Sequence, residues 1–277
     1  MPRVIALFRH PVKGFTAEAC DQLTVQADGR IAGDRVLAFR FADAASPEDR
    51  DGLEHWPKSK GLALQDFPSL AALRLTYDAA ALRVRITHGD AVLVEAGLDP
   101  DGRAALESAG TDFVLASSEA RRLQRRGRLP LVLVGDGVAA RFQDRARGFV
   151  TLHSTESAQA IGAALGQEID DRRFRSNIVI EGTGPWAELG WQGEVRIGDL
   201  RFTVAQPLLR CLATHADPDT GIRDAKVMTT LTGAIGQAEP TLGVALLPVG
   251  DSGGRVGDAG SPVLGSIRVG DEVVVTG

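Results

Sequence analysis

The stretch Arg196–Gly221, RIGDLRFTVAQPLLRCLATHADPDTG, decides how the rest of the chain is interpreted. Its first part alternates apolar and polar residues around Gly198-Asp199, which is typical of two strands joined by a tight turn. Cys211 directly follows Arg210, and the turn sequence DPDTG comes soon after it. A free cysteine is most often a small buried hydrophobe, whereas a cysteine beside a cation can be a reactive thiolate. The stretch alone therefore predicts β structure and leaves both roles of Cys211 open.

The apolar–Gly–Asp pattern recurs at residues 256–258 and 269–271, and at all three places it predicts a turn between strands. Other short β-branched or alternating runs predict strands at 4–8, 21–25, 36–42, 69–75, 82–87, 91–95, 112–116, 131–134, 148–152 and 178–182. Helices are expected at 101–110 and 158–165, and a polar loop at 43–60. This order favours a mostly β fold with some α, built as two β-barrel-like domains rather than alternating β and α units.

Composition excludes several classes of protein. The chain has 277 residues, a net charge of -5 and only two cysteines, Cys20 and Cys211. Two cysteines cannot form a disulfide framework, a Cys₄ zinc site or an iron–sulfur cluster, and the net charge gives no support for a nucleic-acid binder. No apolar run is long enough for a membrane helix, and the first residues lack signal-peptide features. We therefore expect a cytoplasmic protein with free thiols, in which Cys20 is structural.

Two polar segments have ordinary structural explanations. Five arginines at positions 121, 122, 125, 126 and 128 lie in one segment without aromatic neighbours, which favours a solvated helix face over a nucleic-acid site. Ser154 and Thr155, with Glu156 close behind, form a helix-start signal before residues 158–165. A helix start with hydroxyls can also bind an anion, so both interpretations remain open here.

Taken together and in order, these motifs resemble the MOSC-domain family, with its N-terminal β-barrel domain ahead of the MOSC domain proper. The motifs are PVKG at 11–14, GDR at 33–35, HSTES at 153–157, FRSN at 174–177, RC at 210–211 and DPDTG at 217–221. The family's relatives include the mitochondrial amidoxime-reducing component and the C-terminal part of molybdenum cofactor sulfurase. The resemblance covers nearly the whole chain and places the N-terminal domain at residues 1–110 and the MOSC domain at residues 111–277.

The resemblance implies a molybdenum cofactor, a molybdenum–pterin dithiolene with a phosphate, and assigns its contacts. Cys211 falls on the molybdenum-ligand cysteine, which makes it the catalytic residue as well. The cofactor-binding set implied is Lys13, Arg35 and Arg175 for the phosphate, with Ser154, Thr155 and Asn177 nearby. Two residues depart from the family pattern: Leu209 stands where close relatives have serine, and Gly14 stands where the motif has serine after lysine. A backbone N–H at Gly14 can replace the lost hydroxyl.

The implied function is an oxidoreductase that reduces N-hydroxylated small molecules. Electrons are expected from a separate ferredoxin-, flavin- or haem-type donor protein, because the chain has no GxGxxG and no C-x-x-C-H haem motif. Two alternatives remain: a sulfur carrier or cofactor-handling protein with a persulfide on Cys211, and a thiol hydrolase with a Cys211–His215 dyad. The dyad requires the two side chains to come within hydrogen-bond reach.

Overall fold

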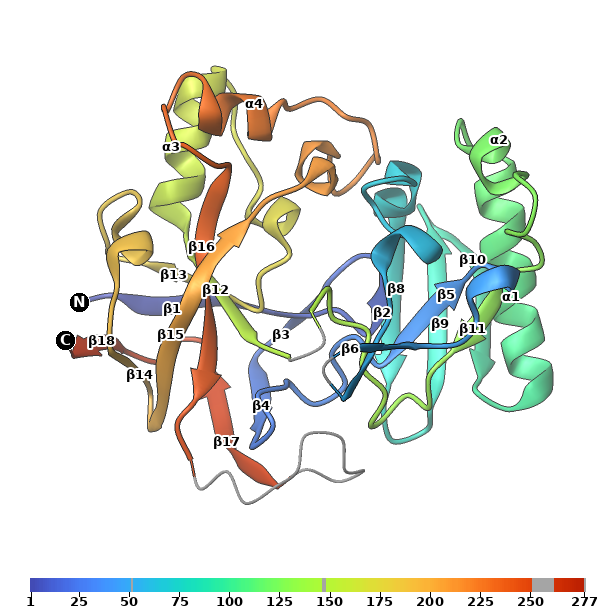
Figure 1. The fold of residues 1–277 in the computed structure, drawn as a ribbon, viewed down its shortest axis with the longest axis horizontal. Helices are drawn as coiled ribbons and strands as arrows, with labels where there is room; N and C mark the ends of the chain where they lie inside the picture. The colour runs from blue at the N-terminus through green and yellow to red at the C-terminus, as the bar shows by residue number, and fades with distance from the viewer. Residues whose placement is uncertain (51, 146–147, 251–261, 277) are drawn as a thin grey trace.

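The computed structural model describes residues 1–50, 52–145, 148–250 and 262–276. Most of its regular elements are strands, as the turn-rich sequence predicts, and the helices are few and mainly short. Figure 1 shows two halves, one built on a large sheet and the other on smaller sheets flanked by a long helix. Among the described residues, no helix combines the length and the apolarity needed to cross a membrane.

The large sheet has eight strands. In spatial order they are β18 (Val273–Thr276), β14 (Glu194–Ile197), β15 (Leu200–Leu209), β16 (Thr241–Pro248), β12 (Val150–Ser154), β13 (Ile178–Glu181), β1 (Arg3–Arg9) and β3 (Glu18–Cys20). The predicted β14–β15 hairpin is present, with Gly198 at φ 56°, a left-handed conformation that glycine adopts at little cost. Strands β12 and β13 are parallel and are joined through α3 (Thr155–Leu165).

Two closed barrels are not confirmed, because the ladder of the described strands is open, with β18 and β3 at its ends. The first and last segments of the chain are nevertheless joined by backbone hydrogen bonds, among them Val4 N–H to Asp271 O at 2.9 Å and Gly270 N–H to Val4 O at 2.8 Å. Residues 269–271 do form a turn, but the strands on either side pair elsewhere: β17 (Val263–Arg268) with β4 (Gln22–Gln26), and β18 with β14. The third predicted turn, at 256–258, lies outside the described residues.

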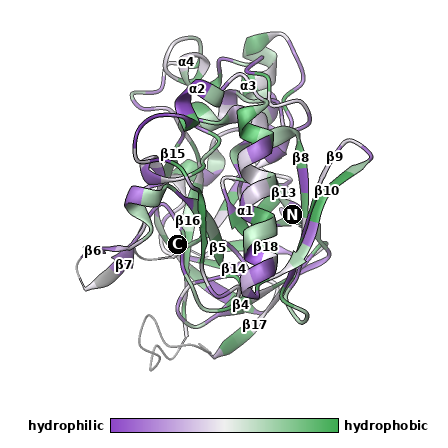
Figure 2. Ribbon diagram, turned by 90° about the vertical axis from the view of Figure 1, so that its right-hand side faces the viewer, coloured by the Kyte–Doolittle hydropathy of each residue, from purple (hydrophilic) through white to green (hydrophobic). Residues whose placement is uncertain are grey.

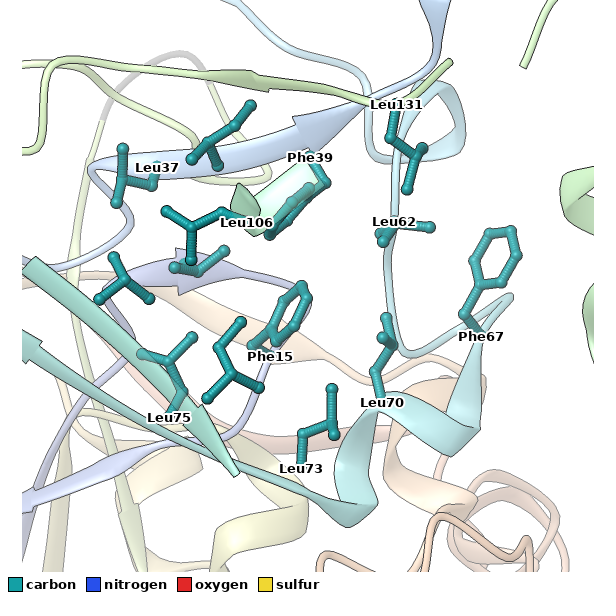
Figure 3. Packing of buried hydrophobic residues seen from close by; sticks show 14 of the residues in the cluster. Phe15, Leu37, Phe39, Leu62, Phe67, Leu70, Leu73, Leu75, Leu106 and Leu131 are labelled. Carbon is teal, nitrogen blue, oxygen red and sulfur yellow. The ribbon is translucent and has the colours of Figure 1, made fainter. Parts of the chain in front are cut away.

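The other half contains a three-stranded meander and a second small sheet (Figure 1). The meander is β8 (Leu73–Asp78), β9 (Arg83–His88) and β10 (Ala91–Gly97), and the second sheet is β2 (Val12–Lys13), β5 (Leu37–Arg40) and β11 (Val132–Val134). Helix α1 (Pro100–Leu115) contacts β10 and β11 and is followed by α2 (Ala120–Leu123). Phe15 and Phe39 meet at 5.2 Å between ring centroids in the core of this half (Figure 3). Each such buried side chain contributes about 1.5–3 kcal/mol.

The remaining elements are short. They are the hairpin strands β6 (Glu48–Arg50) and β7 (Leu53–His55), helix α4 (Val227–Thr232), and the 3₁₀ helices η1 (Ala42–Ala44), η2 (Lys58–Lys60), η3 (Pro68–Ala72), η4 (Asp171–Phe174), η5 (Ala187–Gly190) and η6 (Leu212–His215). Because β1, β3 and β4 come from the first 26 residues and two of them pair with strands of the second half, the division at residue 110 stays a prediction.

Three sequence predictions of local structure were wrong. Residues 112–115 belong to α1 and Ala116 is its C-cap, because Leu106, Gly110 and Val114 are buried at a spacing of four and therefore share one helix face. Residues 69–75 begin as η3 and only Leu73 onward is strand. The segment 43–60 is not a simple loop: it forms the β6–β7 hairpin. Trp56, the residue directly after β7, packs on Phe142 with 5.0 Å between the ring centroids, and this contact fixes the hairpin to the rest of the protein.

Candidate functional site

One cavity of about 620 Å³ brings together residues from both halves of the chain. Its lining includes four of the predicted site residues, Lys13, Arg35, Arg175 and Cys211. A cavity of this size falls within the range of about 300–1,000 Å³ that is usual for small-molecule and cofactor sites. The lining is strongly cationic, with eight lysines and arginines and a single carboxylate, Asp144, among the described residues.

Arg35 is held in place by the loop that precedes β2. Its backbone lies in the left-handed region, with φ 53°, and its N–H donates to His10 O at 2.7 Å. The neighbouring Asp34 carboxylate accepts from the His10 N–H at 2.7 Å and forms an ion pair with the Arg35 guanidinium. Burial opposes the charge of Asp34, but Arg35 and His10 hold the pKa of Asp34 well below its usual range. The carboxylate thus anchors Arg35 and compensates its positive charge.

Arg175 lies beside Arg35 and also has a left-handed backbone, with φ 54° at the end of η4. Arg35 Nη2 donates to the Arg175 carbonyl oxygen at 3.2 Å, and Arg175 Nη1 donates to Phe15 O. Burial and, after it, the charge of Arg35 lower the pKa of Arg175 to about 10. Left-handed backbone costs an L-residue about 1–3 kcal/mol and is concentrated at ligand-binding sites. Two adjacent cations in this conformation therefore indicate an anion site.

Lys13 completes the cationic group. It is buried at the end of β2, where its Nζ donates to Trp56 O at 3.2 Å and lies 3.1 Å from Asp144 Oδ1. Burial lowers the pKa of Lys13, while Asp144 opposes that shift. Lys13, Arg35 and Arg175 come from positions up to 162 residues apart in the chain, so only the folded protein forms this cluster.

Cys211 lies at the end of β15, as the N-cap residue of η6. Its thiol is free and half-buried, and it lines the cavity. The preceding Arg210 donates from Nε to Leu242 O at 2.8 Å and from Nη1 to Phe174 O at 2.7 Å. Burial lowers the pKa of Arg210 to about 10, and Cys211 opposes this shift electrostatically. Two backbone carbonyls therefore fix the Arg210 side chain in place, directly before Cys211 in the chain.

Backbone close to Arg210 leaves no room for a side chain at Gly243. This residue has φ 75°, and a Cβ there would lie 2.3 Å from Leu152 O and 3.1 Å from Arg210 Nη2. Glycine at this position in β16 thus allows the guanidinium to pack against the sheet.

His215 does not form a dyad with Cys211. Its Nε2 accepts a hydrogen bond from the Met228 N–H at 3.1 Å, within the first turn of α4. A ring nitrogen that accepts a backbone N–H is already engaged and cannot act as a base at the same time. His215 is also absent from the residues that line the cavity. Its contacts are those of a helix cap.

Three predicted cofactor-binding residues lie outside the cavity lining: Ser154, Thr155 and Asn177. Ser154 Oγ donates to Glu156 Oε2 at 2.6 Å, and Thr155 Oγ1 donates to Asp171 Oδ2 at 3.0 Å. Asn177 is fully buried, donates to Phe8 O at 3.2 Å and accepts from Thr151 Oγ1 at 2.9 Å. Thr151 does line the cavity, so Asn177 contributes indirectly, by fixing the position of this lining residue.

The two departures from the family pattern have different structural settings. Leu209 lines the cavity and is 54% exposed, so an apolar surface stands two residues before Cys211. Gly14 has φ 84°, and a Cβ there would lie 2.4 Å from Leu62 O. The backbone at this position therefore requires glycine.

Sequence reasoning missed a second set of lining residues, namely Arg50, His55, Lys58 and Arg145. The first three come from the segment that was expected to be a loop, where charged residues are ordinary. Arg50 and His55 stand among acidic residues and form no motif, and the β6–β7 pairing is what brings these two side chains together.

Comparison with known proteins agrees with the resemblance for the second half of the chain. Residues 141–274 match the MOSC domain. The mitochondrial amidoxime-reducing component 1 of Mus musculus is 42% identical over 73 residues, which is 26% of this chain and 21% of that protein. The molybdenum cofactor sulfurase of Bos taurus is 42% identical over 60 residues, which is 22% of this chain and 7% of that protein. The chain thus aligns with about a fifth or less of the length of these two relatives.

Among solved structures, the YUAD protein from Bacillus subtilis aligns with 99% of this chain and 94% of its own, at 11% identity and a TM-score of 0.41. A score of this size does not establish a shared fold.

Proposed function

Since residues 141–274 match the MOSC domain family, we propose that this protein is an oxidoreductase that binds a molybdenum cofactor and reduces N-hydroxylated small molecules. The observation that supports the proposal best is the convergence of Lys13, Arg35, Arg175 and Cys211 on one cavity of about 620 Å³. One relative is named for amidoxime reduction and another for the molybdenum cofactor, which supports the two parts of the proposal.

The residues present fit a cofactor that carries a phosphate and a soft metal. Lys13, Arg35, Arg175 and Arg210 are four cations, and the two carboxylates paired with them are Asp34 and Asp144. Two positive charges remain, one of them on Arg210 beside Cys211, so the lining keeps a net positive charge that suits a phosphate group. The thiol of Cys211 is the soft donor that a metal of this kind prefers.

Each of these residues has a defined role in the proposal. Lys13, Arg35 and Arg175 bind the phosphate through charge-assisted hydrogen bonds. Cys211 would hold the metal through its sulfur, and Arg210 adds a positive charge to the same cavity lining. The cofactor, when bound, supplies the oxygen-atom and redox chemistry, with electrons from a separate donor protein. Small substrates reach Cys211 along the surface that contains Leu209. The cytoplasmic location stays a prediction.

Replacing Cys211 tests this proposal. Protein produced in a host that makes the cofactor should contain molybdenum and should reduce benzamidoxime with a chemical reductant. In Cys211→Ser, a mostly protonated oxygen replaces the thiolate, so turnover should fall by about a hundredfold or more, equivalent to at least about 3 kcal/mol. Part of the molybdenum should remain, because the phosphate contacts are intact. Cys20→Ser is the matched control, since Cys20 lies outside the cavity lining, and its turnover should be unchanged.

A Cys211→Ser protein that is destabilised but fully active per folded molecule would remove Cys211 from the mechanism. The second candidate function, a sulfur carrier, is favoured by the half-buried free thiol itself and by the sulfurase among the relatives. It predicts a labile sulfane sulfur on Cys211, measurable by cyanolysis, in protein that contains no molybdenum.

A further inference from the structure

The β6–β7 hairpin contributes cations to the cavity in addition to the group around Arg35. Figure 2 shows this hairpin projecting from the body of the protein. Arg50 on β6 and Lys58 just after β7 both line the cavity, and so does Arg145. Among the described residues none of these three forms an ion pair with a carboxylate, whereas Lys60, two residues beyond Lys58, is paired with Glu48 at 2.9 Å.

The one carboxylate among the described lining residues does not neutralise them. Asp144 interacts electrostatically with Lys58, but its carboxylate is the partner of Lys13 at 3.1 Å. The charge around the phosphate cations is therefore already balanced by Asp34, Asp144 and the expected phosphate. The charges of Arg50, Lys58 and Arg145 remain as a surplus.

His55 adds an unused hydrogen-bond donor to these charges. It is only 8% exposed and lines the same cavity. Its Nε2 faces Arg50 Nη1 at 3.4 Å, and because a guanidinium can only donate, Nε2 must be the acceptor. The ring proton then lies on Nδ1, which is buried and has no hydrogen-bond partner within the described part of the chain. A buried donor without a partner costs about 1–3 kcal/mol, so this N–H calls for an acceptor.

From these contacts we propose that Arg50, His55 and Lys58 form a second anion subsite, which binds a carboxylate or phosphate group of the substrate. All three present donors and none presents a free acceptor, which is the chemistry that recognises an anionic oxygen. The inference rests on the proposed function for the identity of the reaction, and it adds that anionic N-hydroxylated substrates are preferred over neutral ones.

The test compares two substrates that differ by one carboxylate, benzamidoxime and 4-carboxybenzamidoxime. At about 20 mM salt the KM of the holoenzyme for the carboxylate should be lower by about 5–30-fold, which corresponds to two partly exposed charge contacts. The kcat values should agree within about twofold, because the subsite contacts only the remote end of the substrate. At about 500 mM salt the preference should shrink, since mobile ions screen exposed charges.

Variants then test which residues cause the preference for the carboxylate substrate. The double variant Arg50→Gln, Lys58→Gln should lose it while keeping the KM for benzamidoxime. Arg126→Gln is the matched control, because Arg126 is exposed and lies outside the cavity lining, and it should keep the preference. If wild type shows no preference, or if the double variant retains it, the subsite is refuted.

Two further measurements separate this inference from the proposed function. Titration calorimetry of the holoprotein with 4-carboxybenzamide and benzamide, which are not reduced, reports binding without turnover, and the carboxylate should bind about 5–30-fold more tightly. Tighter binding of the carboxylate with no reduction of either amidoxime would support the subsite and refute the proposed reaction. Denatured holoprotein should release no nucleotide. Nucleotide released in proportion to molybdenum would assign these cations to an extended cofactor and overturn the inference.

Discussion

A single methyl group at Gly14 should weaken both the fold and the phosphate site. Gly14 has φ 84°, and the Cβ of Gly14→Ala would lie 2.4 Å from Leu62 O, closer than van der Waals contact permits. The left-handed backbone costs an L-residue about 1–2 kcal/mol. Relief of the overlap costs about 1–3 kcal/mol more, because the Leu62 N–H is bonded to Phe39 O at 2.9 Å and its backbone cannot simply move away.

Gly89→Ala is the control that separates these two costs. Gly89 also has a left-handed backbone, with φ 56°, but a Cβ there meets nothing within 4 Å. It should therefore lose only the backbone contribution of about 1–2 kcal/mol. The difference between the variants, about 1–3 kcal/mol, corresponds to a further fall in Tm of about 2–12 °C at about 2–4 °C per kcal/mol.

The assay combines thermal unfolding with the molybdenum content of the purified protein. Gly14 follows Lys13 directly, and Lys13 on β2 pairs with Ala38 on β5, so a shift at Gly14 displaces the ammonium from the cavity. Gly14→Ala should lose molybdenum, while Gly89→Ala should retain it. Equal Tm values for the two variants, or full molybdenum content in Gly14→Ala, would refute the reasoning.

Three other substitutions test separate parts of the structure. Arg175→Gln should retain cofactor about 10–100-fold more weakly, because it loses a charge-assisted contact of about 1.5–3 kcal/mol; equal molybdenum content in this variant and in Arg126→Gln would make Arg175 a structural residue. His215→Ala should lose about 0.5–2 kcal/mol of stability with its bond to the Met228 N–H, while the alkylation rate of Cys211, followed by peptide mass, stays unchanged; a large fall in that rate would revive the dyad. Burial, then Arg175 and Arg35, lower the pKa of His10 to about 3 from 6.5. The unfolded chain therefore takes up a proton below pH 6.5 that the folded protein refuses, and the free energy of unfolding of wild type falls as the pH falls from 6 to 4, by up to about 1.4 kcal/mol per pH unit from this residue. In His10→Leu that slope, measured by urea unfolding, should be smaller by the same amount, and an unchanged slope would show that His10 is already charged in the fold.

Motif order identified the residues that converge on the cavity because their type is dictated by chemistry. A thiol and three cations are needed at fixed places in the sequence motifs, and Lys13, Arg35, Arg175 and Cys211 all line the cavity. Ser154, Thr155 and Asn177 occur in the same motifs, yet their polar atoms bond to protein groups. Hydroxyls and amides serve as caps and buried links as readily as they serve ligands, so sequence does not separate the two uses.

The errors in local structure have a related cause. Residues 112–116 are apolar and β-branched enough to form a strand, but the packing of Val114 continues the buried face of α1. Tertiary contacts overrode local preference there. In the segment 43–60, the aromatic contact of Trp56 with Phe142, 86 residues later in the chain, fixes the hairpin. A contact between residues so far apart in sequence leaves no local signal.

The arrangement of the cations bears on the choice between the two candidate functions. A sulfur carrier requires an accessible Cys211 thiol, and it gives no reason for Lys13 to be buried or for Arg35 and Arg175 to adopt left-handed backbone. Burial lowers the pKa of Lys13 and of Arg175, which means that the fold holds both charges at a cost when no anion is bound. A ligand that binds the folded state offsets such a cost in proportion to its affinity. Strained and desolvated cations around a thiol therefore favour a protein that retains a phosphate-bearing cofactor permanently over one that only hands sulfur on.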